Sequence, residues 1–87
     1  MSRKHQHLLH TILHDPMACN LHWRDVEALL LHLGASIAPS HGARFKVILN
    51  EHEFFIHYPG HHNEVQRMDV KHLRENLLHA GVEKRDA

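Results

Sequence analysis

Histidine is the residue type with the greatest chemical potential in this sequence, because 13 of the 87 residues are histidines. Imidazole titrates near neutral pH, so it can act as a general base or acid, and it also ligates metal ions. The histidines are spread along the chain and never stand more than two together. Their abundance therefore raises two possibilities, metal binding and acid–base catalysis.

A metal site would need three or four ligands, usually with thiolate or carboxylate help. His7, His10 and His14 recur at spacings of three and four, so they share one face of a predicted helix. That face lies opposite the apolar one, and a solvated polar face explains it equally well. His72 and His79 have the same relation to the last predicted helix. We predict no dedicated metal site and no cofactor.

Other catalytic patterns are weaker. Cys19 is the single cysteine, so it cannot form an internal disulfide, and no base in the sequence pattern activates it as a nucleophile. The four glycines are not clustered into a phosphate-binding loop. Glu51 and Glu53 share one side of a β segment, where a solvated strand edge explains them better than paired acid–base chemistry.

Cationic side chains form the more informative pattern. Arg67, Lys71 and Arg74 are spaced i, i+4, i+7, which places them on one stripe beside the buried face of the last predicted helix. Arg44 and Lys46 share one face of a predicted strand. If helix and strand meet, these residues form a basic patch that can track phosphates. Otherwise they are solvated charged faces.

The composition describes one small domain over residues 1–87. Ten Lys and Arg balance ten Asp and Glu, which argues against a basic arm or an acidic tail. The longest apolar runs are far shorter than the ~20 residues that span a bilayer. We expect a cytoplasmic protein that does not insert into membranes.

Two helices are predicted in the first part of the chain. The first covers residues 3–14 and is ended by Asp15 and Pro16. The second begins near Trp23 and ends at Gly34, because glycine readily adopts the left-handed conformation that is common at helix ends. Their apolar residues have helical spacing. These are Leu8, Leu9, Ile12 and Leu13 in the first helix, and Val26, Leu29, Leu30 and Leu33 in the second.

Three short strands and a last helix follow. A strand candidate at 35–39 and a turn at 40–42 precede an alternating strand at 44–49. A tight turn at 50–51 connects it to a strand at 52–58. We place Pro59 and Gly60 at the end of that strand and His61, His62 and Asn63 in a loop. The last helix is predicted from about Val65 or Arg67 to Ala80, with Val70, Leu73 and Leu77 buried and Gly81 closing it.

This order predicts an α+β domain in which the helices cover one face of a three-stranded antiparallel sheet and leave the other face open. Five segments of the chain carry a family resemblance: Trp23 to Leu30, Leu33 to Ala35, Gly42 to Val47, His57 with Pro59, and Leu73 to Val82. On these segments the chain resembles the HicA-type toxins of bacterial type II toxin–antitoxin systems. The resemblance implies a HicA-like core over residues 22–82 and, at residues 3–14, an accessory helix typical of a longer branch.

The resemblance implies a small fold like that of double-stranded-RNA-binding domains, helix–three strands–helix, with an additional N-terminal helix. It also implies a metal-independent endoribonuclease, an mRNA interferase, that a HicB-type antitoxin neutralises. The implied chemistry is attack of a ribose 2′-hydroxyl on the adjacent phosphate, with a histidine as general base.

The sequence departs from the family at the catalytic position. The family's histidine follows Gly-Ser at the start of the second strand, where this chain has Arg44 after Gly42 and Ala43. Arginine cannot act as a base at neutral pH. The resemblance implies two other candidate bases: His57, which matches the family's histidine near the end of the third strand, and His41, which directly precedes Gly42 and could substitute if the turn is shifted. The candidate RNA phosphate ligands are Arg44, Lys46, Arg67, Lys71 and Arg74.

Two other functions are open at this point. The chain can be a non-catalytic module that binds RNA or an antitoxin and has lost its active centre. It can also be a histidine-rich metal-binding protein. Cleavage of RNA in the presence of a chelator would support the endoribonuclease and contradict the metal-binding protein. RNA that is bound but not cleaved would support the non-catalytic module.

Overall fold

The computed structural model describes residues 3–15, 17–18, 20–58 and 63–82. The segments predicted for Pro59 to His62, and the position of Cys19, lie outside these residues. The elements follow the order α1 (Arg3–His14), β1 (Leu21–His22), α2 (Trp23–His32), β2 (Ser36–Ser40), β3 (Arg44–Leu49), β4 (His52–His57), β5 (Glu64–Val65) and α3 (Arg67–His79).

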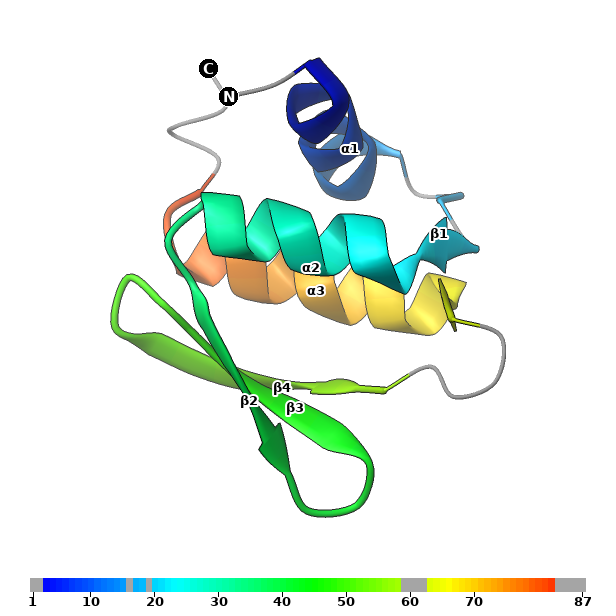
Figure 1. Cartoon of the computed structure of the whole chain (residues 1–87). Helices are drawn as coiled ribbons and strands as arrows, with labels where there is room; N and C mark the ends of the chain where they lie inside the picture. The colour runs from blue at the N-terminus through cyan, green and yellow to red at the C-terminus, as the bar shows by residue number, and fades with distance from the viewer. Residues whose placement is uncertain (1–2, 16, 19, 59–62, 83–87) are drawn as a thin grey trace.

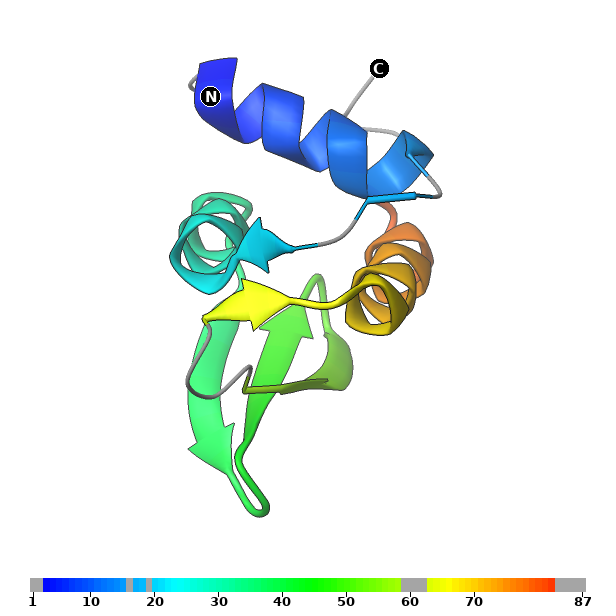
Figure 2. The ribbon, with the colours of Figure 1, turned by 90° about the vertical axis from the view of Figure 1, so that its right-hand side faces the viewer.

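The elements are stacked in three layers. The sheet β2–β3–β4 forms one layer, α2 and α3 lie side by side over one of its faces, and α1 crosses the far side of both helices (Figure 1; Figure 2). This confirms the α+β class and the prediction that the helices share one face of the sheet. None of the described elements covers the opposite face.

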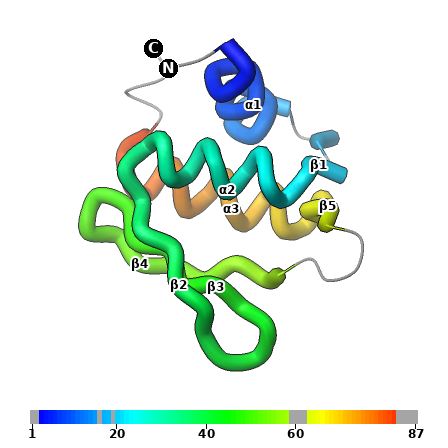
Figure 3. Tube along the Cα trace, viewed as in Figure 1, coloured from blue at the N-terminus to red at the C-terminus, as the bar shows by residue number. Residues whose placement is uncertain are grey.

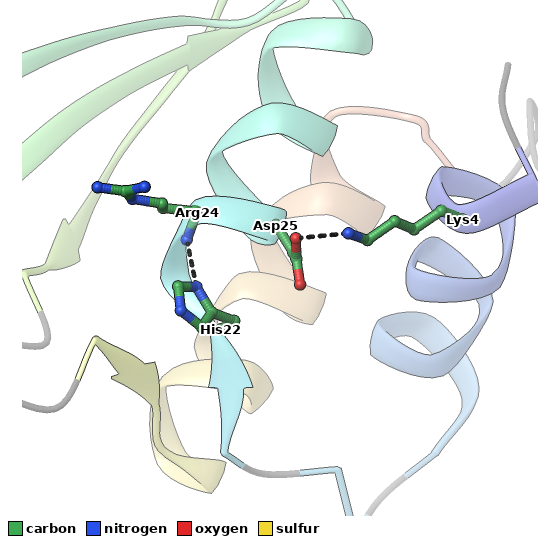
Figure 4. A network of polar contacts seen from close by, with 4 residues as sticks. All are labelled: Lys4, His22, Arg24 and Asp25. Carbon is green, nitrogen blue, oxygen red and sulfur yellow. Dashed lines mark hydrogen bonds and ion pairs between the residues drawn. The ribbon is translucent and has the colours of Figure 1, made fainter.

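The helix α1 has the predicted bounds and buries Leu9, Ile12 and Leu13. An ion pair of 3.1 Å between Lys4 Nζ and Asp25 Oδ1 joins it to the first turn of α2 (Figure 4). None of the helices among the described residues is long and apolar enough to cross a membrane.

The ends of α2 explain why the helix begins and stops where it does. The backbone N–H of Arg24 donates to Nδ1 of His22 at 3.2 Å, so a histidine side chain takes the N-cap role that is usual for Ser, Thr, Asp or Asn (Figure 4). Asp25 in the first turn complements the helix dipole. At the other end Gly34 has φ of 100°, the left-handed conformation predicted from sequence.

The sheet is antiparallel, with β3 in its centre. The strand at 44–49 is confirmed, whereas β2 is shifted by one residue from the predicted 35–39 and β4 ends at His57. The two turn residues at 50–51 both have positive φ, as the type I′ turn of a two-residue hairpin requires. Alternate positions of β3 and β4 point to the helices, and the buried ones are Val47, Leu49, Phe54 and Ile56.

A second, two-stranded sheet was not predicted. β1 and β5 pair antiparallel, with Leu21 opposite Val65 and His22 opposite Glu64. They lie side by side at the ends of α2 and α3 (Figure 3). Because Val65 is in this pairing, α3 begins at Arg67, the later of the two predicted starts. The pairing ties the first turns of α2 and α3 together.

Candidate functional site

The uncovered face of the sheet carries most of the candidate residues. The register places Arg44 opposite His57 and Lys46 opposite Phe55. Since side chains alternate along a strand, all four project from the face away from α2 and α3. The predicted alternation of β3, with Arg44 and Lys46 on one side, is therefore confirmed.

An open hollow of about 470 Å³ lies where this face meets the flank of α3. It is lined by side chains of three elements: Arg44 from β3, Phe54, Phe55 and His57 from β4, and Asp69 and His72 from α3. β4 is an edge strand, so its outer edge lies beside α3 rather than beside another strand. The polar groups that line the hollow are therefore one guanidinium (Arg44), two imidazoles (His57 and His72) and one carboxylate (Asp69).

Arg44 is held by contacts on two sides. Its Nε donates to the carbonyl of His41 at 3.1 Å, and its guanidinium carbon lies 5.2 Å from the centre of the Phe55 ring. The first contact fixes the side chain against its own hairpin turn, and the second is a cation–π contact. The two terminal nitrogens of Arg44 make no hydrogen bond with any described residue. A fixed, permanently charged fork of this kind suits a phosphate oxygen pair.

His57 is the last residue of β4 and is exposed. The backbone N–H of the next residue, Tyr58, donates to the carbonyl of Ala43 at 2.8 Å, which extends the pairing past the strand end. His57 therefore stands on a fixed backbone beside Arg44. This is one of the two histidines that the sequence singled out as bases.

His41, the other predicted base, lies in the turn between β2 and β3 and is exposed. It is not among the residues that line the hollow. Its backbone carbonyl holds Arg44, as described above. The structure thus places His57, rather than His41, among the groups of the hollow.

His72 is the residue that sequence reasoning missed. The sequence predicted a solvated helix face for it, and the side chain is indeed exposed, but its Nε2 also lies 3.2 Å from the Phe55 carbonyl at the outer edge of β4. Asp69, His72 and Asn76 are spaced i, i+3, i+7, which puts them on one flank of the buried stripe. That spacing was visible in the sequence, but the strand that it meets was not.

The cations of α3 lie on the other flank. Arg67, Lys71 and Arg74, with Met68, line a second hollow of about 290 Å³. The predicted stripe exists, but the strand cation Arg44 lines the first hollow and these three line the second.

Two of these cations already have partners in the α1 region. Arg74 donates to backbone carbonyls at the end of α1, from Nε to Ile12 and from Nη2 to Asp15, both at 2.6 Å. Arg67 contacts the sulfur of Met17, with 3.7 Å between Nη1 and Sδ. Lys71 is exposed and makes no polar contact with a described residue. Of the three, Lys71 is the one left for an external anion.

Lys46 is partly neutralised. Its Nζ lies 3.9 Å from Oε1 of Glu53, its diagonal neighbour on β4, and both side chains are about half exposed. A pair this exposed contributes little to stability, but it lowers the net charge beside Arg44. Arg44 is therefore the principal cation of the uncovered face.

Among the described residues, no three His, Cys, Asp or Glu side chains come together as a metal cluster. The predicted histidine pair of α1 is close, with ring centres of His10 and His14 4.6 Å apart, but it remains a pair.

Comparison with known proteins assigns the chain to no family. No protein-family model matches it, and no curated protein or solved structure matches it either. The geometry of the first hollow is therefore the main guide to function.

Proposed function

We propose that this protein binds single-stranded RNA at the first hollow and cleaves it without a metal ion. The observation that carries the proposal is the meeting of Arg44, His57 and His72 around one open hollow. A guanidinium that binds a phosphate beside two imidazoles that can exchange protons is a sufficient set for RNA transesterification.

The reaction would proceed by internal attack. One imidazole, as the neutral base, takes the proton of a ribose 2′-hydroxyl while that oxygen bonds to the adjacent phosphorus. The bond from phosphorus to the 5′-oxygen of the next nucleotide breaks, and the other imidazole, as the protonated acid, gives its proton to that oxygen. The products are a 2′,3′-cyclic phosphate and a 5′-hydroxyl. Arg44 stabilises the charge that builds on the non-bridging oxygens.

The wider biological role rests on the resemblance to HicA-type toxins. In this proposal the chain is the toxin of a type II toxin–antitoxin pair, acts on mRNA in the cytoplasm and is silenced by a HicB-type antitoxin. The element order from α2 to α3, with both helices on one face of three antiparallel strands, supports a fold like that of double-stranded-RNA-binding domains.

Binding without cleavage is the second candidate. It is favoured by one observation: Arg44 stands where the family resemblance places the catalytic histidine. In that reading the hollow retains the phosphate ligand, and the two imidazoles of His57 and His72 bind RNA without exchanging protons.

The test is incubation of the purified protein with an unstructured RNA in excess chelator. We expect cleavage that leaves a 2′,3′-cyclic phosphate, and loss of the rate by about 10²–10⁴-fold in His57→Ala and in His72→Ala. His7→Ala, which changes an exposed histidine of α1, is the matched control, and His41→Ala tests the other predicted base. An RNA with 2′-deoxyribose at the cleaved position should resist cleavage.

The outcomes separate the candidates. RNA that is bound but not cut by the wild type favours the binding module. RNA that is neither bound nor cut contradicts both. Cleavage that stops in chelator contradicts the metal-free mechanism, and cleavage unaffected by His57→Ala and His72→Ala shows that the hollow is not the active site.

A further inference from the structure

The side chain of Asn76 connects His72, which lines the hollow, to a second histidine, His52. Its Oδ1 lies 2.9 Å from Nε2 of His52, at the start of β4. Its Nδ2 lies 2.8 Å from the backbone carbonyl of His72, one turn earlier in α3, and 3.2 Å from Nε2 of the His72 ring. Asn76 thus lies between the end of the β3–β4 hairpin and the histidine that lines the hollow.

The hydrogen-bond partners fix the orientation of this amide. A backbone carbonyl only accepts, so the atom next to the His72 carbonyl must be the amide nitrogen. Oδ1 then faces His52, whose Nε2 must carry a proton and donate. With both ends held, the second N–H of Asn76 is kept beside the His72 ring.

Two different groups compete for Nε2 of His72. The Phe55 carbonyl lies 3.2 Å away and can only accept, whereas the Asn76 amide also lies 3.2 Å away and can only donate. When Nε2 is protonated it donates to Phe55, and when it is not it accepts from Asn76. Either way Nε2 is occupied by protein, and Nδ1 makes no hydrogen bond with a described residue.

We propose that Asn76 is a positioning residue for His72: its amide and the Phe55 carbonyl hold Nε2, so that Nδ1 is the atom that exchanges the proton with bound RNA. The carbonyl favours the neutral tautomer with a bare Nδ1, which can act as a base, and it also accepts from the imidazolium, which can give its Nδ1 proton as the acid. The amide favours the neutral tautomer with a protonated Nδ1, which is too weak an acid to give that proton, so the part of the amide is to hold the ring in place. The part of this inference that concerns RNA rests on the function proposed above.

The competition for Nε2 is measured first on the full chain without RNA. Nuclear magnetic resonance of the labelled His72 ring reports which nitrogen carries the proton in the neutral state. In Asn76→Ala the amide donor is gone, so we expect the population protonated at Nδ1 to fall and the Nε2–H tautomer to take over. Alanine is a better helix former than asparagine, so α3 should persist.

Two further variants make this result specific. Asn76→Asp keeps an oxygen for His52 but has no amide proton for His72, so it should shift the tautomers in the same direction. Glu75→Ala changes an exposed neighbour on α3 and should leave them unchanged. Identical tautomer populations in wild type and Asn76→Ala would overturn the inference, whether or not the protein cleaves RNA.

The second measurement asks whether Asn76 acts through His72 during cleavage. Asn76→Ala should slow cleavage about tenfold in the wild-type background, because only one of the two contacts that hold Nε2 of the His72 ring then remains. In the His72→Ala background it should change the rate by less than about twofold, because its target is absent. Equal slowing in both backgrounds would show that Asn76 acts independently of His72. A wild type without cleavage contradicts the proposed function. The tautomer measurement then tests only whether Asn76 controls which nitrogen of His72 carries the proton.

Discussion

Arg44 and His57 are directly opposed residues of neighbouring strands, yet the guanidinium of Arg44 contacts the diagonal neighbour Phe55 instead. Long side chains reach such diagonal neighbours across an antiparallel pair. Within the described residues Arg44 makes no hydrogen bond with the His57 ring. The guanidinium of Arg44 and the imidazole of His57 thus lie side by side on one strand pair, and each can still form hydrogen bonds with a ligand.

Replacing Arg44 should therefore weaken RNA binding through the loss of a phosphate contact. In Arg44→Gln we expect lower affinity and a shallower dependence on salt, with the slope of log affinity against log salt reduced by about 0.7 for a single strand. Filter binding or fluorescence anisotropy at several salt concentrations measures this slope. Lys46→Gln is the comparison, and its effect should be smaller because Glu53 already offsets that charge. An unchanged slope in Arg44→Gln would remove Arg44 from the binding site.

Arg74 should matter for stability more than for RNA. Its Nε satisfies the carbonyl of Ile12, which has no partner within α1, and its charge complements the helix dipole there. Its Nη2 adds a second hydrogen bond to the carbonyl of Asp15, just beyond the helix, which also accepts from the backbone N–H of Ala18. Arg74→Met should lower the free energy of unfolding by about 1–3 kcal/mol, since hydrogen bonds to charged groups are stronger than neutral ones. Urea denaturation followed by circular dichroism measures the change.

Lys71→Met is the control for that experiment. Lys71 lies on the same flank of α3, is exposed and has no polar contact with a described residue, so its replacement should change stability by less than about 0.5 kcal/mol. Equal losses in both variants would indicate that α3 needs positive charge in general and not the Arg74 contacts.

The helices and the sheet were predictable because their apolar residues recur with the periods of helix and strand. The role of Arg74 was not, since its spacing matches that of Arg67 and Lys71, and only the position of α1 distinguishes them. The sheet formed by β1 and β5 was missed for a related reason. Each strand has two residues, which is too short for any alternation, and the partners are more than forty residues apart in sequence.

The same limit applies to the candidate site. His57 could be identified because the family resemblance implies a histidine near the end of the third strand, and Arg44 because it shares one face of an alternating strand with Lys46. His72 belongs to a helix flank that sequence alone reads as solvated, and its importance depends on which strand packs there. The periodicity of a helix or strand predicts the direction in which a side chain points, but it does not predict which other element packs against that side chain.

A pair of adjacent leucines in α2 tests which face of this helix packs in the hydrophobic core. Leu30 is fully buried and Leu31, the next residue, is 54% exposed. Leu30→Ala should lower the free energy of unfolding by about 2–5 kcal/mol, because it removes buried methyl groups and leaves a cavity. Leu31→Ala should change it by less than about 0.5 kcal/mol. Chemical denaturation of the pair measures both, and similar values would mean that α2 presents a different face to the core.

The turn between β3 and β4 provides a stabilising change. Glu51 has φ of 67°, a left-handed conformation that costs a residue with a Cβ about 1–2 kcal/mol. Glycine adopts it freely but loses more entropy on folding, so Glu51→Gly should raise the free energy of unfolding by about 0.5–1 kcal/mol. Thermal and urea unfolding would both report the gain.

Asn50 is the matched position because its φ is 52° but its side chain is in use. Its Nδ2 donates to the carbonyl of Ala80 at 2.8 Å, which fastens the hairpin to the end of α3. Asparagine also tolerates the left-handed conformation, so Asn50→Gly should relieve little strain and lose about 1 kcal/mol with that hydrogen bond. Opposite signs for two adjacent residues would separate backbone strain from side-chain bonding. A gain of stability in both variants would show that the contact between Asn50 and Ala80 contributes little to holding the hairpin against α3.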